Sequence, residues 1–172
     1  TGLLYSEKFI TNLVELSRKY NKYIIADEVY LPLTSKKTIY KNNYKNTIVI
    51  SSFSKYWAVP GWRVGWILAD SNIISKLVKI QSTIFTCAPT ASQEVCIKLL
   101  KDKFKPDLTI LEEAKERLSN IFKEKGWIVP ENKELSMYLF PVNNKPLIEY
   151  PISASLTSNS VSETWVDTDS IE

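Results

Sequence analysis

Apolar and polar residues follow two different periods along the chain. Between residues 7 and 20, apolar side chains recur at three- and four-residue spacing, which predicts a helix with one buried stripe. Short apolar runs at 23–26, 47–50 and 64–69 are rich in β-branched or aromatic residues, which favours buried strands. The alternation of helix and strand predicts an α/β fold.

Three more helices are expected further along the chain. Ser71 or Asn72 is a candidate N-cap for the first, and Pro89 opens a second that runs to about residue 100. A long charged helix is expected over 106–125, with Gly126 at its end. Apolar runs at 127–130 and 137–141 are then expected to form strands.

The segment 51–66 contains several residues whose side chains could take part in binding or catalysis. It holds two of the 4 glycines and three of the 5 tryptophans, and it follows a predicted buried strand. Lys55 lies between the hydroxyls of Ser52 and Ser54 and the guanidinium of Arg63. If the chain stays extended, the two hydroxyls point the same way. Hydroxyls and a guanidinium bind phosphate well, and a lysine beside them can form a Schiff base.

A pair of acids follows the strand predicted at 23–26. A carboxylate such as Asp27 at the tip of a buried strand needs a positive partner, and a protonated pyridine nitrogen would serve. Tyr30, three residues later, could aim its phenol at the same ligand. Simpler interpretations remain open: Asp27 in a loop turn or helix cap, Tyr30 and the tryptophans in packing, Lys55 solvated, and Arg63 in a surface ion pair.

Taken together, these segments resemble the fold-type I aminotransferases of class I/II, which use pyridoxal 5′-phosphate. The Asp-x-x-Tyr pattern, the Ser-x-Ser-Lys pattern and the arginine eight residues after the lysine occur in order. The sequence from Trp57 to Trp66 is most similar to that of the tyrosine aminotransferase branch. Thr1-Gly2 resembles the end of that family's Asn-Pro-Thr-Gly motif, and the resemblance extends over about residues 1–140.

The resemblance implies a role for each polar residue of the two segments. Lys55 would form the Schiff base with the cofactor aldehyde and move protons at the substrate α-carbon. Asp27 would pair with the pyridinium nitrogen, and Tyr30 would donate to the phenolic oxygen of the ring. The cofactor phosphate would be bound by Ser52, Ser54 and Arg63.

The implied activity is transamination of an aromatic L-amino acid with a 2-oxo acid. A homodimer in the cytoplasm is expected, with the segment 83–89 near its interface. Two alternatives stay open. One is a pyridoxal-phosphate-dependent lyase of the same fold, for example one that cleaves C–S bonds. The other is a non-catalytic orphan fragment.

The resemblance also implies a domain plan. Residues 1–104 would form the C-terminal portion of the large domain with a mostly parallel sheet. Residues 105–150 would supply the connecting helix and the start of a small α+β domain. Residues 151–172, rich in Ser and Thr with only acidic charges, are expected to be a disordered tail. Because the family pattern begins upstream of Thr1 and uses a later arginine, we expect an internal piece that is inactive alone.

Composition excludes several other classes of function. With 172 residues and 44% apolar content, the chain suits an ordinary globular domain. A net charge of +3 without a basic stripe does not support nucleic-acid binding. The absence of histidine argues against a zinc site or a Ser-His-Asp triad, and Cys87 and Cys96 lack a metal or redox spacing. No stretch has the length of a membrane span or the pattern of a signal peptide.

Overall fold

The computed structural model describes residues 4–127 and residue 129. The chain divides into two compact units, one of residues 7–107 and one of residues 1–6 with 108–172. The first unit contains every side chain that the sequence nominates for a site. The predicted strand at 137–141, the predicted tail at 151–172 and most of the run at 127–130 lie outside the described residues.

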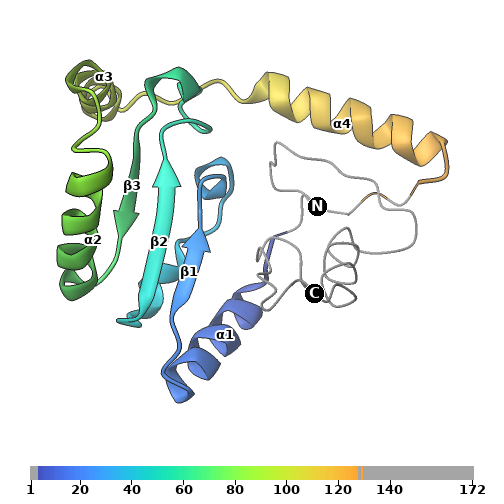
Figure 1. The fold of residues 1–172 in the computed structure, drawn as a ribbon. Coiled ribbons are helices and arrows are strands. Elements are labelled where there is room, and N and C mark those ends of the chain that lie inside the picture. The colour runs from blue at the N-terminus through green and yellow to red at the C-terminus, as the bar shows by residue number, and fades with distance from the viewer. Residues whose placement is uncertain (1–3, 128, 130–172) are drawn as a thin grey trace, which may run out of the picture. The chain divides into compact units, whose positions relative to one another are not determined.

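A three-stranded sheet forms the centre of the first unit (Figure 1). β2 (Thr47–Ser52) lies between β1 (Ile24–Asp27), to which it is parallel, and β3 (Gly65–Leu68), to which it is antiparallel. The expected α/β class is therefore confirmed. The described sheet is mixed instead of mostly parallel, because the chain turns back after β2 without a crossover helix.

One face of the sheet is packed. The helix α1 (Glu7–Lys19) lies within one residue of its predicted bounds and covers β1 and β2 with its apolar stripe. The buried residues of this cluster come from α1, both strands and the connection between them, and they are Val14, Ile24, Ile39, Tyr44 and Val49. The buried positions of β1 and β2 therefore alternate, as expected of strands with one covered face.

The opposite face is open in the described residues. Ile25, Ile50 and Ile67 lie on this face and are 56%, 37% and 42% exposed. All four residues of β3 are exposed, which contradicts the prediction of a buried strand at 64–69. The pattern correctly indicated an apolar strand, but within the part of the chain that the structure describes β3 pairs only with β2.

The connection between β1 and β2 is more ordered than its Lys- and Asn-rich sequence indicates. It forms two short 3₁₀ helices, η1 (Leu31–Leu33) and η2 (Ile39–Asn42). A third 3₁₀ helix, η3 (Pro60–Trp62), lies in the later connection between β2 and β3. Asn43 ends η2 with a left-handed backbone at φ 51°, a conformation that asparagine tolerates better than most residues.

Three further helices complete the described chain. α2 (Ser71–Ile84) is capped by Asp70, whose carboxylate accepts a hydrogen bond from the Asn72 N–H at 2.9 Å. The predicted caps Ser71 and Asn72 are therefore wrong, because both already lie inside the helix. α3 (Thr90–Lys101) begins directly after Pro89, as expected.

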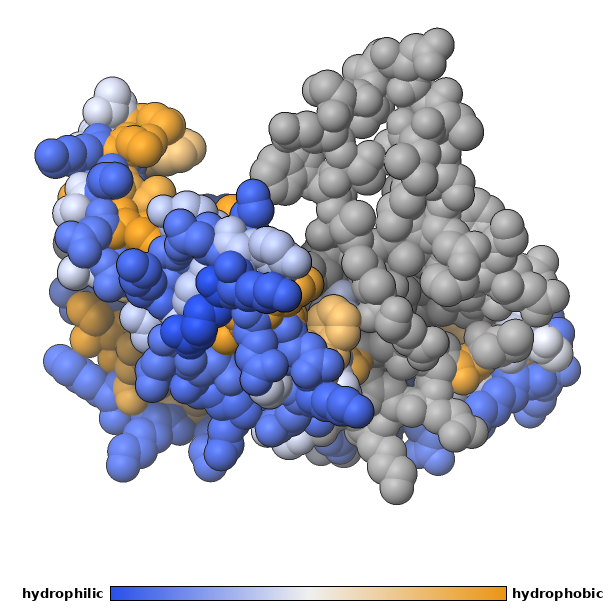
Figure 2. Space-filling model, turned by 90° about the horizontal axis from the view of Figure 1, so that it is seen from below, coloured by the Kyte–Doolittle hydropathy of each residue, from blue (hydrophilic) through white to orange (hydrophobic). Residues whose placement is uncertain are grey.

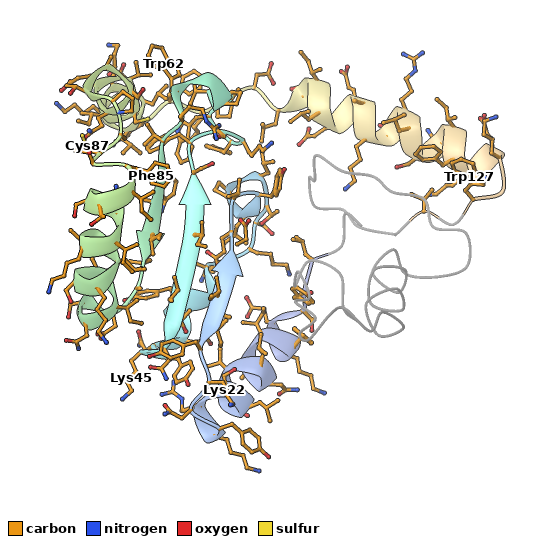
Figure 3. The ribbon with its side chains drawn as sticks, viewed as in Figure 1. Lys22, Lys45, Trp62, Phe85, Cys87 and Trp127 are labelled. Carbon is orange, nitrogen blue, oxygen red and sulfur yellow. The ribbon has the colours of Figure 1, made fainter. Side chains whose placement is uncertain are left out.

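The helix α4 (Thr109–Glu124) belongs to the second unit and starts later than its predicted beginning at residue 106. Gly126 follows it with φ 74°, and its N–H donates to the Lys123 carbonyl at 2.9 Å, so the predicted glycine stop is confirmed. Trp127 stacks on Phe122 with ring centroids 5.2 Å apart (Figure 3). Among the described residues, no helix combines the length and apolarity needed to cross a membrane.

Apolar side chains reach the surface on the α2 side of the first unit. No residue of α2 is buried, and Val78, Ile80 and Ile84 are each more than half exposed. Figure 2 shows hydrophobic atoms at the surface on the side where α2 lies in Figure 1. Phe85, which follows the helix, is 75% exposed.

Candidate active site

The polar residues nominated by the sequence gather at one end of the sheet. β1 and β2 both finish at this end, and β3 begins there (Figure 1). Figure 3 places Trp62 at this end and Lys22 and Lys45 at the opposite end. The carboxyl ends of parallel strands are where α/β proteins bind ligands, so this edge is the candidate site.

Strand alternation directs Asp27 and Ser52 to the same face. Ile24 and Val49 point toward α1, and successive side chains in a strand alternate between faces. Asp27 is three residues after Ile24, and Ser52 is three residues after Val49, so both lie on the face away from α1. Gly65 is paired with Ser52 across the sheet and adds no side chain there.

Lys55 lies in the turn that follows β2 and is half-buried. Its ammonium nitrogen is 5.5 Å from the centroid of the Tyr30 ring, which is within the range of a cation–π contact. Tyr30 comes from the other strand connection, directly before η1. The structure therefore brings together two nominated residues that are separated by a whole strand.

A cluster of aromatic rings surrounds the lysine turn. Phe53 lies 4.7 Å from Trp57 and 5.1 Å from Trp66 between ring centroids, and Trp57 lies 4.9 Å from Tyr56. These rings come from both sides of Lys55 and from β3. Edge-to-face and tilted pairs at such distances stabilise the conformation of a turn, so the cluster fixes the backbone that carries Lys55.

Two nominated side chains make local turns. The Asp27 carboxylate accepts a hydrogen bond from the Val29 N–H at 3.0 Å, so the loop-turn interpretation of Asp27 is correct for one of its oxygens. The Ser52 hydroxyl accepts one from the Ser54 N–H at 3.2 Å. Ser54 lies in a turn closed by this bond, so the chain does not stay extended after β2 and the condition under which the two hydroxyls would point the same way is not met.

Arg63 lies at the end of η3 in a left-handed backbone conformation with φ 54°. Its side chain is exposed, and Nη1 donates to the Pro60 carbonyl at 2.9 Å. The following strand approaches β2 closely, since a Cβ on Gly65 would lie 2.9 Å from the Ser51 carbonyl oxygen. Gly65 thus allows the strand after Arg63 to pair at the site.

Glu28 is a residue of this region that the sequence analysis did not single out. Its carboxylate oxygen Oε1 accepts a hydrogen bond from the Ile39 N–H at 2.7 Å, eleven residues away. The sequence signal that could have found it is its place beside Asp27. Successive side chains of an extended chain point to opposite faces, so two adjacent acids are expected to have different partners. Within the described residues, no group of three or more His, Cys, Asp or Glu side chains is arranged to hold a metal ion.

Comparison with known proteins shows which family the chain matches. Residues 1–162 match the family described as aminotransferase class I and II. The chain is 31% identical over 147 residues to the aspartate aminotransferase of Thermotoga maritima, covering 81% of the chain and 38% of that protein. It is 33% identical over 165 residues to nicotianamine aminotransferase A of Hordeum vulgare, covering 86% and 36%.

Solved structures agree with the sequence relatives. The crystal structure of aspartate aminotransferase from Thermotoga maritima superposes with a TM-score of 0.73 at 28% identity, covering 91% of this chain and 43% of that one. A Methanococcus jannaschii structure, described as similar in its active site to kynurenine aminotransferases, gives 0.69 at 26% identity, covering 91% and 43%. The chain thus spans less than half the length of the relatives that it matches, and it belongs to the class I and II aminotransferase family.

Proposed function

We propose that this chain carries the lysine-bearing part of a pyridoxal 5′-phosphate-dependent aminotransferase. Members of the class I and II aminotransferase family use that cofactor. The observation that carries the proposal is the contact of the Lys55 ammonium with the Tyr30 ring, at the sheet end where Asp27 and Ser52 share a face.

The chemistry of the side chains at this edge fits the cofactor. A carboxylate can pair with the pyridine nitrogen, and an amine can condense with the aldehyde. A hydroxyl and a guanidinium can bind the phosphate. Arg63 uses one N–H for the Pro60 carbonyl, and a guanidinium has five. Ser54, half-buried in the turn beside Lys55, adds a second hydroxyl.

When bound, pyridoxal 5′-phosphate supplies an aldehyde and a ring that accepts electron density from the substrate α-carbon. Lys55 would hold this cofactor through Nζ, by condensing with its aldehyde with loss of water. Once an amino acid has displaced the lysine, its free Nζ would remove the proton from the substrate α-carbon as a general base and later return a proton as an acid. Lys55 thus acts at each half of the reaction.

The other residues bind and orient. Asp27 holds the proton on the pyridine nitrogen by charge pairing, and Tyr30 donates to the phenolic oxygen of the ring. Ser52, Ser54 and Arg63 bind the phosphate, where a planar guanidinium can form two parallel hydrogen bonds. Two features support this assignment: the shared face of Asp27 and Ser52, and the aromatic cluster that fixes the lysine turn.

The finer proposal concerns the substrates and the assembly. We propose an aromatic L-amino acid as donor, as in tyrosine aminotransferases, and a 2-oxo acid as acceptor, in the cytoplasm. The support is the resemblance of residues 57–66 to that branch. We also propose a homodimer whose interface includes residues 83–89. Support comes from Phe85 and Cys87, which are both exposed between α2 and α3 (Figure 3).

Borohydride trapping tests the proposed role of Lys55. The complete gene product, loaded with pyridoxal 5′-phosphate, is expected to absorb visible light, and reduction is expected to fix the cofactor to the peptide that contains Lys55. Lys55→Ala should abolish both trapping and transamination. Lys45→Ala, at the opposite end of the sheet, should change neither. Trapping at another lysine would refute the assignment, and elimination without transamination would identify a lyase.

A further inference from the structure

The loop between β1 and β2 is closed by a single acidic residue. The Glu28 N–H donates to the Ile50 carbonyl at 2.8 Å and continues the strand pairing one residue beyond β1. The Glu28 carbonyl accepts from the Leu31 N–H at 3.1 Å and from the Ser51 hydroxyl at 3.3 Å. Its main chain therefore anchors the start of the loop to β2.

The side chain of the same residue anchors the loop again at Ile39. Oε1 accepts from the Ile39 N–H at 2.7 Å, at the start of η2. Ile39 is itself buried in the core cluster beneath α1, so the carboxylate ties the loop to the buried core of the unit.

Tyr30 lies inside the segment that these bonds define. It is the third residue of the turn closed by the Leu31 N–H and the Glu28 carbonyl, and its own carbonyl accepts from the Leu33 N–H at 3.0 Å. Its ring faces the Lys55 ammonium at 5.5 Å. The place of this ring is thus set by a segment that Glu28 anchors twice, through its main chain at the start and through its carboxylate at Ile39.

We propose that Glu28 is a positioning residue, which holds the loop from residue 28 to residue 39 closed and thereby keeps Tyr30 against Lys55. Asp27 and Glu28 then divide two tasks between two faces, Asp27 toward the ligand and Glu28 toward the loop. This inference rests on the proposed function, because a positioning role requires that Tyr30 and Lys55 act on the cofactor.

Three variants separate this role from general destabilisation. Glu28→Ala removes the acceptor for the Ile39 N–H, and Glu28→Gln keeps an oxygen there. Thr38→Ala is the matched control, since its hydroxyl accepts from the nearby Tyr40 N–H at 3.2 Å in the same loop. In the complete gene product, kcat/KM should fall about tenfold in Glu28→Ala and stay within about twofold in the other two.

A double-mutant cycle with Tyr30→Ala supplies the decisive measurement. If Glu28 acts through Tyr30, Glu28→Ala should add little to the loss already caused by Tyr30→Ala, both in kcat/KM and in the rate of borohydride trapping at Lys55. Amide hydrogen exchange at Ile39 should quicken at least about tenfold in Glu28→Ala and hardly change in Glu28→Gln.

The outcomes distinguish the two levels of the proposal. Wild-type trapping at Lys55 with an unimpaired Glu28→Ala variant would overturn the positioning role alone, and so would additive losses in the cycle. An equal loss in Glu28→Gln would also overturn it, because the negative charge would then matter in place of the loop closure. Absence of trapping at Lys55 in the wild type would overturn the proposed function and this role with it.

Discussion

The two faces of the sheet differ in what covers them, although both are apolar. On the α1 face, Val49 is 3% exposed and Ile24 is 7% exposed. On the open face, Ile25 is 56% exposed and Ile50 is 37% exposed, one residue further along the same strands. The same strands thus contribute to a packed core and to an uncovered surface.

This contrast shows that an apolar position in the sequence and an actually buried position in the structure are different properties. An apolar position indicates that burial would stabilise the fold, by about 25 cal/mol per Å² of apolar surface. It does not indicate that a partner is present. In the described residues, stability should therefore come mainly from the α1 face, and the open face should tolerate substitution.

The largest effect is expected from a pair of neighbouring isoleucines in β1. Ile24→Ala should destabilise this chain by about 2–4 kcal/mol, because it leaves a cavity beneath α1. Ile25→Ala should cost less than about 1 kcal/mol, because its side chain is already half in water. Urea unfolding of both variants of this chain measures the difference. Equal losses would show that the open face is covered in solution.

A second pair of variants tests the backbone on the open side. Gly65→Ala should destabilise by about 1–3 kcal/mol, because the new Cβ would lie 2.9 Å from the Ser51 carbonyl oxygen. Gly61→Ala should cost much less, since no atom lies within 4 Å of a Cβ built there. Thermal melts of the two variants provide the test. A Gly65→Ala variant as stable as Gly61→Ala would contradict the close approach of β3 to β2.

The two cysteines allow the reactivity of an exposed thiol to be compared with that of a buried one in the region of α2 and α3. Cys96 in α3 is 4% exposed, and burial raises the pKa of its thiol. Cys87, between the helices, is exposed. An alkylating reagent should therefore modify Cys87 at least roughly tenfold faster than Cys96 under native conditions. Peptide mapping over time reads the two rates, and similar rates would show that α3 is not packed around Cys96.

The smallest effect is expected at an ion pair between α1 and η2. Lys41 Nζ donates to Glu7 Oε1 at 3.0 Å, and this bond lowers the pKa of the exposed Glu7 carboxyl from its ordinary value of 4.5. The contribution to stability is therefore present above pH 4.5 and lost as the pH falls through the folded-state pKa. Lys41→Met should lower the melting temperature slightly at pH 7 and not at pH 2. A deficit that persists at low pH would assign it to lost packing.

Much of the fold could be predicted from local pattern. The helix at 7–19 and the first two strands follow from periodicity, because one face of each is buried against the others. The exposure of β3 could not be predicted, since it depends on what lies beside the strand. The Asp70 cap was missed because Ser71 and Asn72 are equally good capping residues by type, and only the backbone conformation distinguishes them.

The sequence nominates the residues of the candidate site, but it does not give their geometry. The contact between Lys55 and Tyr30 joins two segments that the sequence had assigned to one ligand. The bend at Ser54 depends on a hydrogen bond from its own N–H to Ser52, which residue types alone do not reveal. The carboxylate of Glu28 was missed because its partner is a backbone N–H eleven residues away.

The aromatic cluster gives the protein an optical consequence of its own. Trp57 and Trp66 lie 6.1 Å apart at the turn that carries Lys55, so their emission arises next to that amine. A chromophore attached to Lys55 that absorbs where indoles emit will accept excitation energy from these tryptophans and dim their fluorescence. Occupancy at this position can therefore be followed by light from the native chain, without an added label.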